Sequence, residues 1–299
     1  MNRPTRQTTG GSAYLDLQRL ARETSRPTDE LLLRYVLERF LHRLSTSRYA
    51  DRLVLKGGML LEVLGVRRPT RDIDLAAQGL SEDIATIREA IQEIAALDLD
   101  DGVVFSVAEL TVEDIREEDI QGGLRFRIPA GLDRARMTLA IDVSFGEAVT
   151  PRPRRVRYPT LLRTEPFNLL SYPVTTVLAE KVETMIRRGA ANTRDRDFLD
   201  TWLLLRHHSI AAGEMRAALE ATTRRRATRL RPLSEALGDL AQRRQPDWIR
   251  YLKRVGLASA VPESLSEVVS AITGFADPVI ARTVVNGRWD PTAGSWTAR

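Results

Sequence analysis

The chain of 299 residues contains no cysteine and only three histidines. Without cysteine it can form no disulfide bond, thiolate metal site or cysteine nucleophile. His42, His207 and His208 are too few and too scattered for a histidine metal site. No apolar run approaches the roughly twenty residues of a membrane-spanning helix, and the polar segment 1–12 lacks the apolar core of a signal peptide. We therefore expect a cytoplasmic protein with no membrane partner.

Lysine is also scarce, although lysine and arginine together number 45. It occurs only at Lys56, Lys181 and Lys253. A lysine ammonium is a compact point charge that suits a single phosphate oxygen, whereas the planar guanidinium of arginine favours forked contacts. Lys181 lies in a helical pattern over residues 174–188, so it is a candidate for such a contact. Lys56 is either a second phosphate contact or a solvated charge.

The hydrophobic content of 43% allows one sizeable core and a smaller second one. Periodicity predicts helices over about 13–44 and 82–96, and a mixed sheet with strands near 53–55, 103–111, 124–128 and 137–145. The proline- and arginine-rich run 151–155 ends this part, because proline removes backbone donors. Beyond about Leu161 the pattern is helical nearly to Phe275, and the tail after Asn286 is expected to be weakly ordered. We predict an α/β domain over residues 1–157 and a helical domain over residues 158–299.

Two carboxylates spaced two apart follow a glycine pair. Asp72 and Asp74 project from one face of a predicted strand, while Ile73 faces the core. Such hard oxygen ligands suit Mg²⁺, and the pair can hold two metals about 4 Å apart over a nucleoside triphosphate. Gly57 and Gly58 precede a predicted short helix, 59–64, and let the backbone approach phosphates closely. The alternative is a simple turn followed by solvated aspartates at a strand end.

These features follow one another as strand, glycine pair, short helix, basic loop (67–71) and aspartate-bearing strand. The order resembles the nucleotidyltransferase core of the DNA polymerase β superfamily, and most closely the AbiEii/AbiGii toxin family. The chain is also similar to the mycobacterial MenT toxins. The family pattern G-G-x-x-L followed by R-x-T-x-D-I-D-L is matched almost letter for letter. One departure is that Gly58 and Met59 stand where relatives often have a hydroxyl residue, so a phosphate-contacting hydroxyl is absent there.

The resemblance implies roles for residues elsewhere in the chain. Asp142, on the apolar run 137–143, would supply the third metal-binding carboxylate; the alternative is a surface aspartate near a strand end. Lys181 would contact the triphosphate. Arg194, Asp197 and Asp200 match the family element R-x-x-D-x-x-D, although a helix dipole also favours acids at a helix start. The implied residues are Asp72, Asp74, Lys181 and Asp200 for catalysis; Gly57, Gly58, Arg71, Lys181 and Asp197 for nucleotide binding; and Asp72, Asp74 and Asp142 for the metal.

The net charge is +5, with a sequence pI near 9.8. Basic residues are concentrated in the C-terminal part, where Arg224, Arg225, Arg226 and Arg229 follow one another closely. Such a cluster is typical of a surface that contacts a nucleic-acid backbone, and Trp248 and Tyr251 beyond it could stack on unpaired bases. Alternatively, the charges belong to a solvated helix face and the aromatic residues to the core.

The resemblance implies a Mg²⁺-dependent toxin that adds nucleotides from CTP or UTP to the 3′ end of tRNA and so blocks aminoacylation. It further implies a cognate antitoxin encoded alongside. Two alternatives remain. A nucleotidyltransferase that modifies a protein or small molecule would share the metal site without needing the basic cluster. A catalytically silent nucleic-acid-binding protein would need the basic cluster and not the carboxylates.

Overall fold

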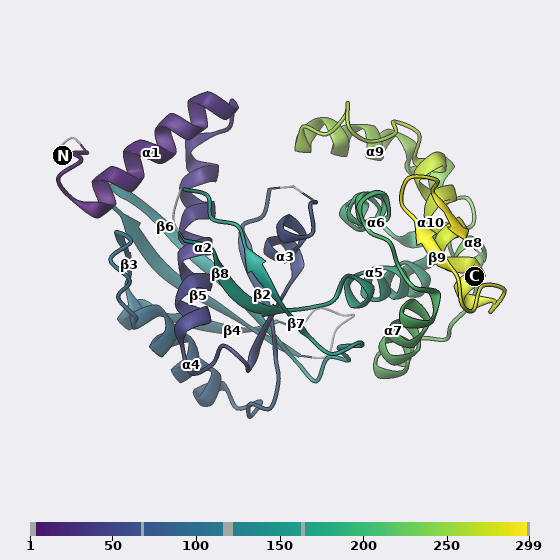
Figure 1. The fold of residues 1–299 in the computed structure, drawn as a ribbon, viewed down its shortest axis with the longest axis horizontal. Coiled ribbons are helices and arrows are strands. Elements are labelled where there is room, and N and C mark those ends of the chain that lie inside the picture. The colour runs from purple at the N-terminus through teal and green to yellow at the C-terminus, as the bar shows by residue number, and fades with distance from the viewer. Residues whose placement is uncertain (1–3, 67–68, 116–121, 163–164, 298–299) are drawn as a thin grey trace. The chain divides into compact units, whose positions relative to one another are not determined.

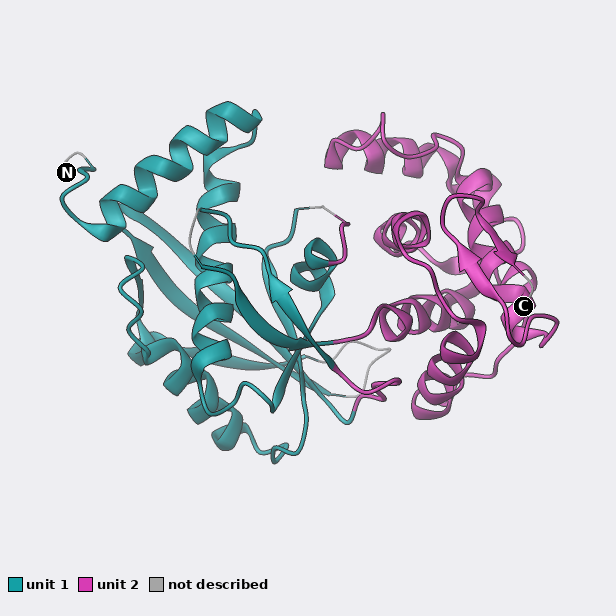
Figure 2. Cartoon of the chain, in the orientation of Figure 1, with its two compact units in different colours: residues 1–63, 69–146, 154–171 teal, residues 64–68, 147–153, 172–299 magenta. Residues whose placement is uncertain are grey.

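The structure is a computed structural model that describes residues 4–66, 69–115, 122–162 and 165–297 (Figure 1). Arg67 and Arg68 of the basic loop therefore lie outside the described residues. The chain divides into two compact units (Figure 2). Unit 1 comprises residues 1–63, 69–146 and 154–171, and unit 2 comprises residues 64–68, 147–153 and 172–299.

A mixed sheet forms the centre of unit 1. Its strands are β1 (Leu53–Lys56), β2 (Asp72–Ala77), β3 (Val103–Phe105), β4 (Thr111–Ile115), β5 (Gly123–Leu132), β6 (Ala135–Phe145), β7 (Arg154–Tyr158) and β8 (Phe167–Ser171). The spatial order is β3-β5-β6-β2-β1-β8-β7, with β4 pairing with β5. β2 runs parallel to β6 and β1 parallel to β8, while the other pairs are antiparallel. The predicted α/β fold with a mixed sheet is confirmed.

Four α-helices accompany this sheet in the described part of unit 1: α1 (Thr9–Thr24), α2 (Thr28–Thr46), α3 (Gly57–Val63) and α4 (Ile84–Ala96). The predicted helical region 13–44 is divided into α1 and α2 at Ser25, whose left-handed φ of 52° ends α1. Pro27 then caps α2. α2 contacts β5, β6 and β8 and buries Phe40 and Leu41 completely, so it supplies much of the core against the sheet.

Residues 154–158 and 167–171 form strands, where the sequence predicted first a boundary and then only helix. β8 buries Phe167 and Leu169 and pairs with β1 and β7. β7 lies at the sheet edge, a position in which nearby prolines are tolerated. The helical prediction for residues 167–171 is wrong, because five residues are too few for periodicity to separate strand from helix. The boundary predicted after residue 157 falls within β7, and the sheet continues to Ser171.

Unit 2 is mainly helical. Its elements are α5 (Val174–Arg188), a 3₁₀ turn (Gly189–Ala191), α6 (Asp195–His207), α7 (Ala212–Arg225), α8 (Leu233–Leu237), α9 (Leu240–Val255), α10 (Leu265–Ile280), β9 (Arg288–Asp290) and β10 (Ser295–Thr297). α5 contacts α6, α7 and α8, and α10 contacts α6, α7, α8 and α9. The predicted helical C-terminal part is confirmed. None of the helices in the described ranges has the length and apolar character needed to cross a membrane.

Residues 287–297 are ordered, so the prediction of a weakly ordered tail is wrong for this described part of the segment after Asn286. β9 and β10 form an antiparallel hairpin that pairs Trp289 with Trp296. The Trp289 side chain packs edge-on against Phe275, and the Trp296 ring stacks on the same phenylalanine. Each indole N–H donates to a backbone carbonyl, that of Leu205 for Trp289 and that of Phe275 for Trp296. The two tryptophans therefore attach the hairpin to α6 and α10.

Arg226, directly after α7, joins three acidic side chains of unit 2. Its Nη1 donates to Glu183 at 2.8 Å and its Nη2 to Glu180 at 3.2 Å, both on α5. Glu147 lies 3.7 Å from the same Nη2. The Arg226 side chain is 11% exposed and the Glu183 side chain 0%. This buried ion-pair network therefore connects the end of α7 to α5.

We predict that Arg226→Ala lowers the free energy of unfolding by about 3 kcal/mol, because the fully buried Glu183 loses a cationic partner and keeps Arg187. Arg224→Ala is the matched control: it removes the same charge from an exposed neighbour and should cost no more than about 0.5 kcal/mol. Urea denaturation of both variants measures the difference. Equal losses would contradict a structural role for the Arg226 network.

Candidate functional site

The two aspartates of the D-x-D motif lie on β2, with their side chains half-buried and Ile73 and Leu75 fully buried. The register of the sheet pairs Asp74 with Asp142 of β6 on one side and with Lys56 of β1 on the other. The three carboxylates that the resemblance selects therefore come from two neighbouring parallel strands of unit 1.

Negative charge is crowded at this point of the sheet. Burial raises the pKa of Asp74 above its ordinary value, and the charges of Asp72 and Asp142 raise it further. The charge of Lys56 and a hydrogen bond from the Gly58 amide lower it, but not enough to cancel the rise. A bound cation would relieve this repulsion, so Asp72 and Asp74 fit the chemistry of a divalent metal site.

The glycine pair is required by the close approach of Asp74. Gly57 has a φ of +64°, and a Cβ atom built on it would lie 1.8 Å from Asp74 Oδ2. The amide of Gly58 lies 3.4 Å from the same oxygen and donates to it. At Gly58 a Cβ would lie 2.4 Å from Thr70 Oγ1. Both positions therefore exclude a side chain, because Asp74 and Thr70 occupy the space.

Thr70 supplies a hydroxyl close to Gly58, whereas Gly58 and Met59 themselves carry none. Its Oγ1 lies 3.2 Å from Asp72 Oδ1, to which it donates. The sequence alone does not reveal this contact, because the distance between Thr70 and Gly58 depends on how the loop returns. Arg71, the predicted nucleotide-binding residue beside it, is exposed.

Asp142 is bound by an arginine that the sequence reasoning missed. Arg125 of β5 lies opposite Asp142 in the antiparallel β5–β6 register. Its Nε and Nη2 donate to the two carboxylate oxygens at 2.7 and 2.5 Å. The pairing of Arg125 with Asp142 could be predicted only from the position of the hairpin turn after Leu132, which fixes the residues that face one another. That position is not evident from the sequence.

This forked contact bears on the predicted three-carboxylate metal site. Within residues 4–66, 69–115, 122–162 and 165–297, no group of three acidic, histidine or cysteine side chains is arranged to hold a metal ion. Asp72 and Asp74 fit a cation, whereas both oxygens of Asp142 are engaged by the guanidinium of Arg125. The metal-binding role of Asp142 stays a prediction that requires Arg125 to release it.

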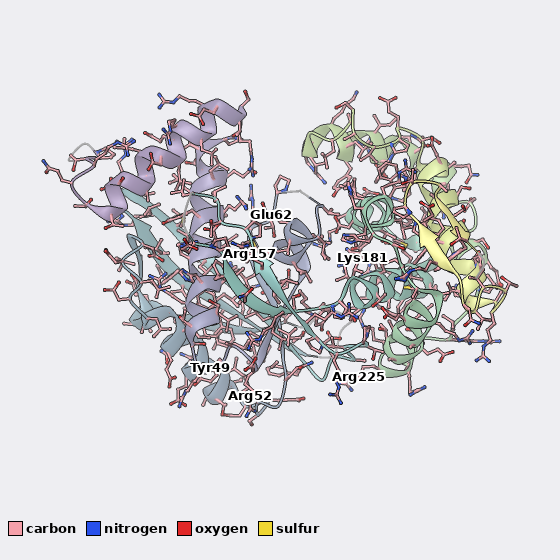
Figure 3. All side chains as sticks on the ribbon, viewed as in Figure 1. Tyr49, Arg52, Glu62, Arg157, Lys181 and Arg225 are labelled. Carbon is pink, nitrogen blue, oxygen red and sulfur yellow. The ribbon has the colours of Figure 1, made fainter. Side chains whose placement is uncertain are left out.

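In unit 2, the predicted triphosphate lysine lies between two acids. Lys181 projects from α5 (Figure 3), and its Nζ donates to Asp197 at 2.9 Å and to Asp200 at 2.8 Å, both on α6. Asp197 also accepts a hydrogen bond from Arg194 Nε at 2.8 Å. Burial alone would raise the pKa of Asp197, but the charges of Lys181 and Arg194 outweigh it and lower the pKa to about 2. The structure thus brings Lys181 together with the three residues of the R-x-x-D-x-x-D element, Arg194, Asp197 and Asp200.

The predicted basic surface is interrupted. Arg224, Arg225 and Arg229 are exposed, with Arg225 at the end of α7 (Figure 3). The Arg226 side chain is 11% exposed and pairs with three glutamates, so its contact with RNA stays a prediction that would require it to leave this network. Its partners come from α5 and from the segment before residue 153, and nothing local in the arginine run indicates them.

The aromatic residues beyond this run belong to the core of unit 2. Trp248 is completely buried and donates from its indole N–H to the Pro262 carbonyl, and Tyr251 is 8% exposed. The suggestion that they stack on unpaired bases is wrong, and the alternative of a core position is confirmed.

A family model described as "Nucleotidyl transferase AbiEii toxin, Type IV TA system" matches residues 39–270, well over half of the chain. The chain belongs to the AbiEii nucleotidyltransferase toxin family. The resemblance seen in the motifs is thereby confirmed: the protein is a nucleotidyltransferase, and its family is that of toxins from type IV toxin–antitoxin systems. The matched range contains the glycine pair, both aspartates of β2, Asp142 and Lys181.

Two solved structures from Helicobacter pylori are similar to this chain. One is JHP933, with 13% sequence identity, a TM-score of 0.47, and coverage of 85% of this chain and 93% of that one. The other is provisionally described as a nucleotidyltransferase, with 13% identity, a TM-score of 0.48, and coverage of 85% and 96%. A comparison with curated proteins gave no match.

We predict that Gly57→Ala costs more than backbone strain alone, because its Cβ would collide with Asp74. The matched control is Gly65→Ala, at a φ of +79°, where no atom of the described residues lies within 4 Å of the added Cβ. Strain at such a position is worth about 1–2 kcal/mol, so Gly65→Ala should lose about that much and Gly57→Ala clearly more. Thermal and urea unfolding measure the stability of both variants. Equal losses of stability would show that the Asp74 side chain moves aside at no cost.

The contact between Arg125 and Asp142 gives a second prediction. If Asp142 is a metal ligand, Arg125→Gln removes a competing cation, and the affinity for Mn²⁺ should rise by about tenfold, or about 1.4 kcal/mol. Arg127→Gln is the matched control, because Arg127 also lies on β5 but pairs with the exposed Glu113. Titration calorimetry measures both variants. An affinity that stays level or falls in Arg125→Gln would mean that Asp142 serves only to hold Arg125.

Proposed function

We propose that this AbiEii-family enzyme transfers a nucleotide, from CTP or UTP, to the 3′ acceptor end of tRNA and thereby blocks aminoacylation. The observation that carries the transferase chemistry is the crowded carboxylate pair of β2, with Asp74 packed directly against the glycine pair. The family implies a cognate antitoxin that opposes this activity. The nucleotide and the tRNA acceptor rest on the resemblance and on the positive charge of the chain.

Residues of unit 1 would hold the metal and orient its ligands. Asp72 and Asp74 would hold Mg²⁺, with Asp142 joining them if Arg125 releases it. When bound by these carboxylates, Mg²⁺ would supply Lewis-acid chemistry at the α-phosphate and would lower the cost of deprotonating the attacking hydroxyl. Gly57 and Gly58 let Asp74 and Thr70 pack against the backbone where side chains would otherwise stand. A contact of these two glycines with the phosphates is what the family resemblance implies. Thr70 orients the carboxylate of Asp72 through its hydroxyl.

Lys181 would place positive charge on the leaving pyrophosphate. Asp197 and Asp200 fix its ammonium by two hydrogen bonds, and Lys181 is 13% exposed while Asp200 is fully buried. Asp200 therefore acts through Lys181, as a positioning residue. A lysine fixed in this way loses little conformational entropy when it meets a phosphate, which favours preorganised binding.

One observation favours a different acceptor. Because Arg226 is neutralised by three glutamates, the exposed arginine cluster is smaller than the sequence suggests. A smaller basic surface reduces the counterion release that drives RNA binding. A protein or small-molecule acceptor would use the same carboxylates and would not need the arginines, so it is the second candidate.

The test is incubation of the protein with total tRNA, Mg²⁺ and each labelled nucleoside triphosphate in turn. We expect label at the tRNA 3′ end, with CTP or UTP giving the strongest incorporation and EDTA abolishing it. Label that appears on a protein or a small molecule, and never on RNA, would refute the tRNA acceptor while keeping the transferase.

Asp74→Asn tests the metal site. The change keeps the shape but removes charge, so transfer should fall by at least about a hundredfold, or about 2.7 kcal/mol of barrier. Because the carboxylate of Asp74 is partly desolvated and repelled by Asp72, the variant should be at least as stable as the wild type in thermal unfolding. Asp114→Asn, an exposed carboxylate on β4, is the control and should retain activity. Wild-type transfer by Asp74→Asn would remove the basis for the proposal.

A further inference from the structure

Unit 2 contains a cavity of about 290 Å³ at the end of α7, in the stretch of chain from residue 186 to residue 231. Four arginines line it: Arg187 from the end of α5, and Arg226, Arg229 and Arg231 from the segment after α7. Thr228 adds a hydroxyl. No carboxylate is among the described residues that line it. The lining is therefore rich in hydrogen-bond donors and in positive charge.

A buried acid beneath the lining holds several of these side chains in place. Glu183 accepts hydrogen bonds from Arg187 Nε at 3.0 Å and from Arg226 Nη1 at 2.8 Å. It also accepts one from the hydroxyl of Thr228. The Glu183 side chain is fully buried, so it fixes the side chains of Arg187, Arg226 and Thr228 without being exposed to a ligand. Donors that are fixed before a ligand arrives lose less entropy when they bind it.

Arg229 and Arg231 carry the positive charge of the lining that the buried glutamates do not offset. Arg229 is exposed, and no hydrogen bond or ion pair joins it to another described residue. Arg231 is 42% exposed and lies 3.9 Å from Glu235, an exposed acid four residues later. An exposed pair at that distance contributes little. Since the three glutamates around Arg226 offset the inner charges, Arg229 and Arg231 are the groups most able to meet an anion.

Three backbone amides of the loop are already engaged within the protein. The amides of Arg226, Ala227 and Thr228 donate to the carbonyls of Thr222, Arg224 and Thr223 and complete the end of α7. The arginine side chains are therefore the main donors of the lining, and guanidinium groups match the oxygen atoms of a phosphate in forked pairs. The volume is near the lower end, roughly 300 Å³, of sites that hold small ligands, which suits a phosphate with part of its substituent.

We propose that this arginine-lined cavity is a binding site for a phosphate group. It goes beyond the proposed transfer reaction, because its residues are separate from those that surround Lys181. Glu180, Glu183 and Arg187 follow the three- and four-residue spacing of one helix face, whereas Lys181 is about 100° away from Glu180 around α5. The phosphate belongs either to an RNA strand or to a free polyphosphate, and the two sources are distinguishable.

The experiment compares the wild type with the double variant Arg229→Ala/Arg231→Ala. Two probes are titrated by calorimetry in EDTA across a salt series: a short oligouridylate without a terminal phosphate, and inorganic tripolyphosphate. The matched control, Arg250→Ala/Arg288→Ala, removes two exposed arginines of unit 2 outside the cavity. Thermal unfolding checks that both double variants are folded.

We expect the cavity variant to lose affinity by about tenfold for at least one probe, while the control keeps the wild-type values. For the oligouridylate, the salt dependence should also flatten by roughly one unit of slope, because fewer counterions are released. Loss for the oligouridylate identifies a strand phosphate, and loss for tripolyphosphate alone identifies a free polyphosphate. Wild-type binding of both probes by the cavity variant, or equal losses in the control, would overturn the proposal. Because EDTA prevents metal-dependent transfer, this outcome is independent of whether the proposed transfer reaction occurs.

Discussion

The pairing of β2 with β6 is the constraint on which the candidate site of unit 1 depends. It sets Asp74 beside Asp142, while β1 places Lys56 on the other side. The glycine pair then becomes necessary, because Asp74 fills the space that a side chain at Gly57 would occupy. A one-residue shift between the strands would turn the acids to opposite faces and remove the site.

Arginine side chains connect segments that are distant along the chain, which this chain, having no cysteine, cannot join by disulfide bonds. Arg43 of α2 is almost fully buried and binds both oxygens of Asp101, together with the carbonyls of Leu97 and Val103. Arg226 does the same for the glutamates of unit 2. A guanidinium with five donors can satisfy several acceptors at once, which makes it suited to such positions. The net positive charge is therefore a poor measure of how basic the surface is.

The elements that the sequence predicts well are those whose evidence is local. The helix over 174–188 and the D-x-D strand both follow from spacing within one element. The features it misses depend on partners that are distant along the chain. Arg125 meets Asp142 only through the β5–β6 register, Arg226 meets acids from two other segments, and β8 is defined by its pairing with β1.

The rarity of lysine has a practical chemical consequence. Amine-reactive reagents can address only three side chains, together with the α-amino group of the chain. The Lys181 side chain is 13% exposed and is held by two carboxylates. Lys56 is half-buried next to Asp74. Lys253, by contrast, is exposed on α9. A fluorophore or a surface-coupling group can therefore be attached to the side chain of Lys253 in preference to the two lysines of the candidate sites, without any engineered cysteine.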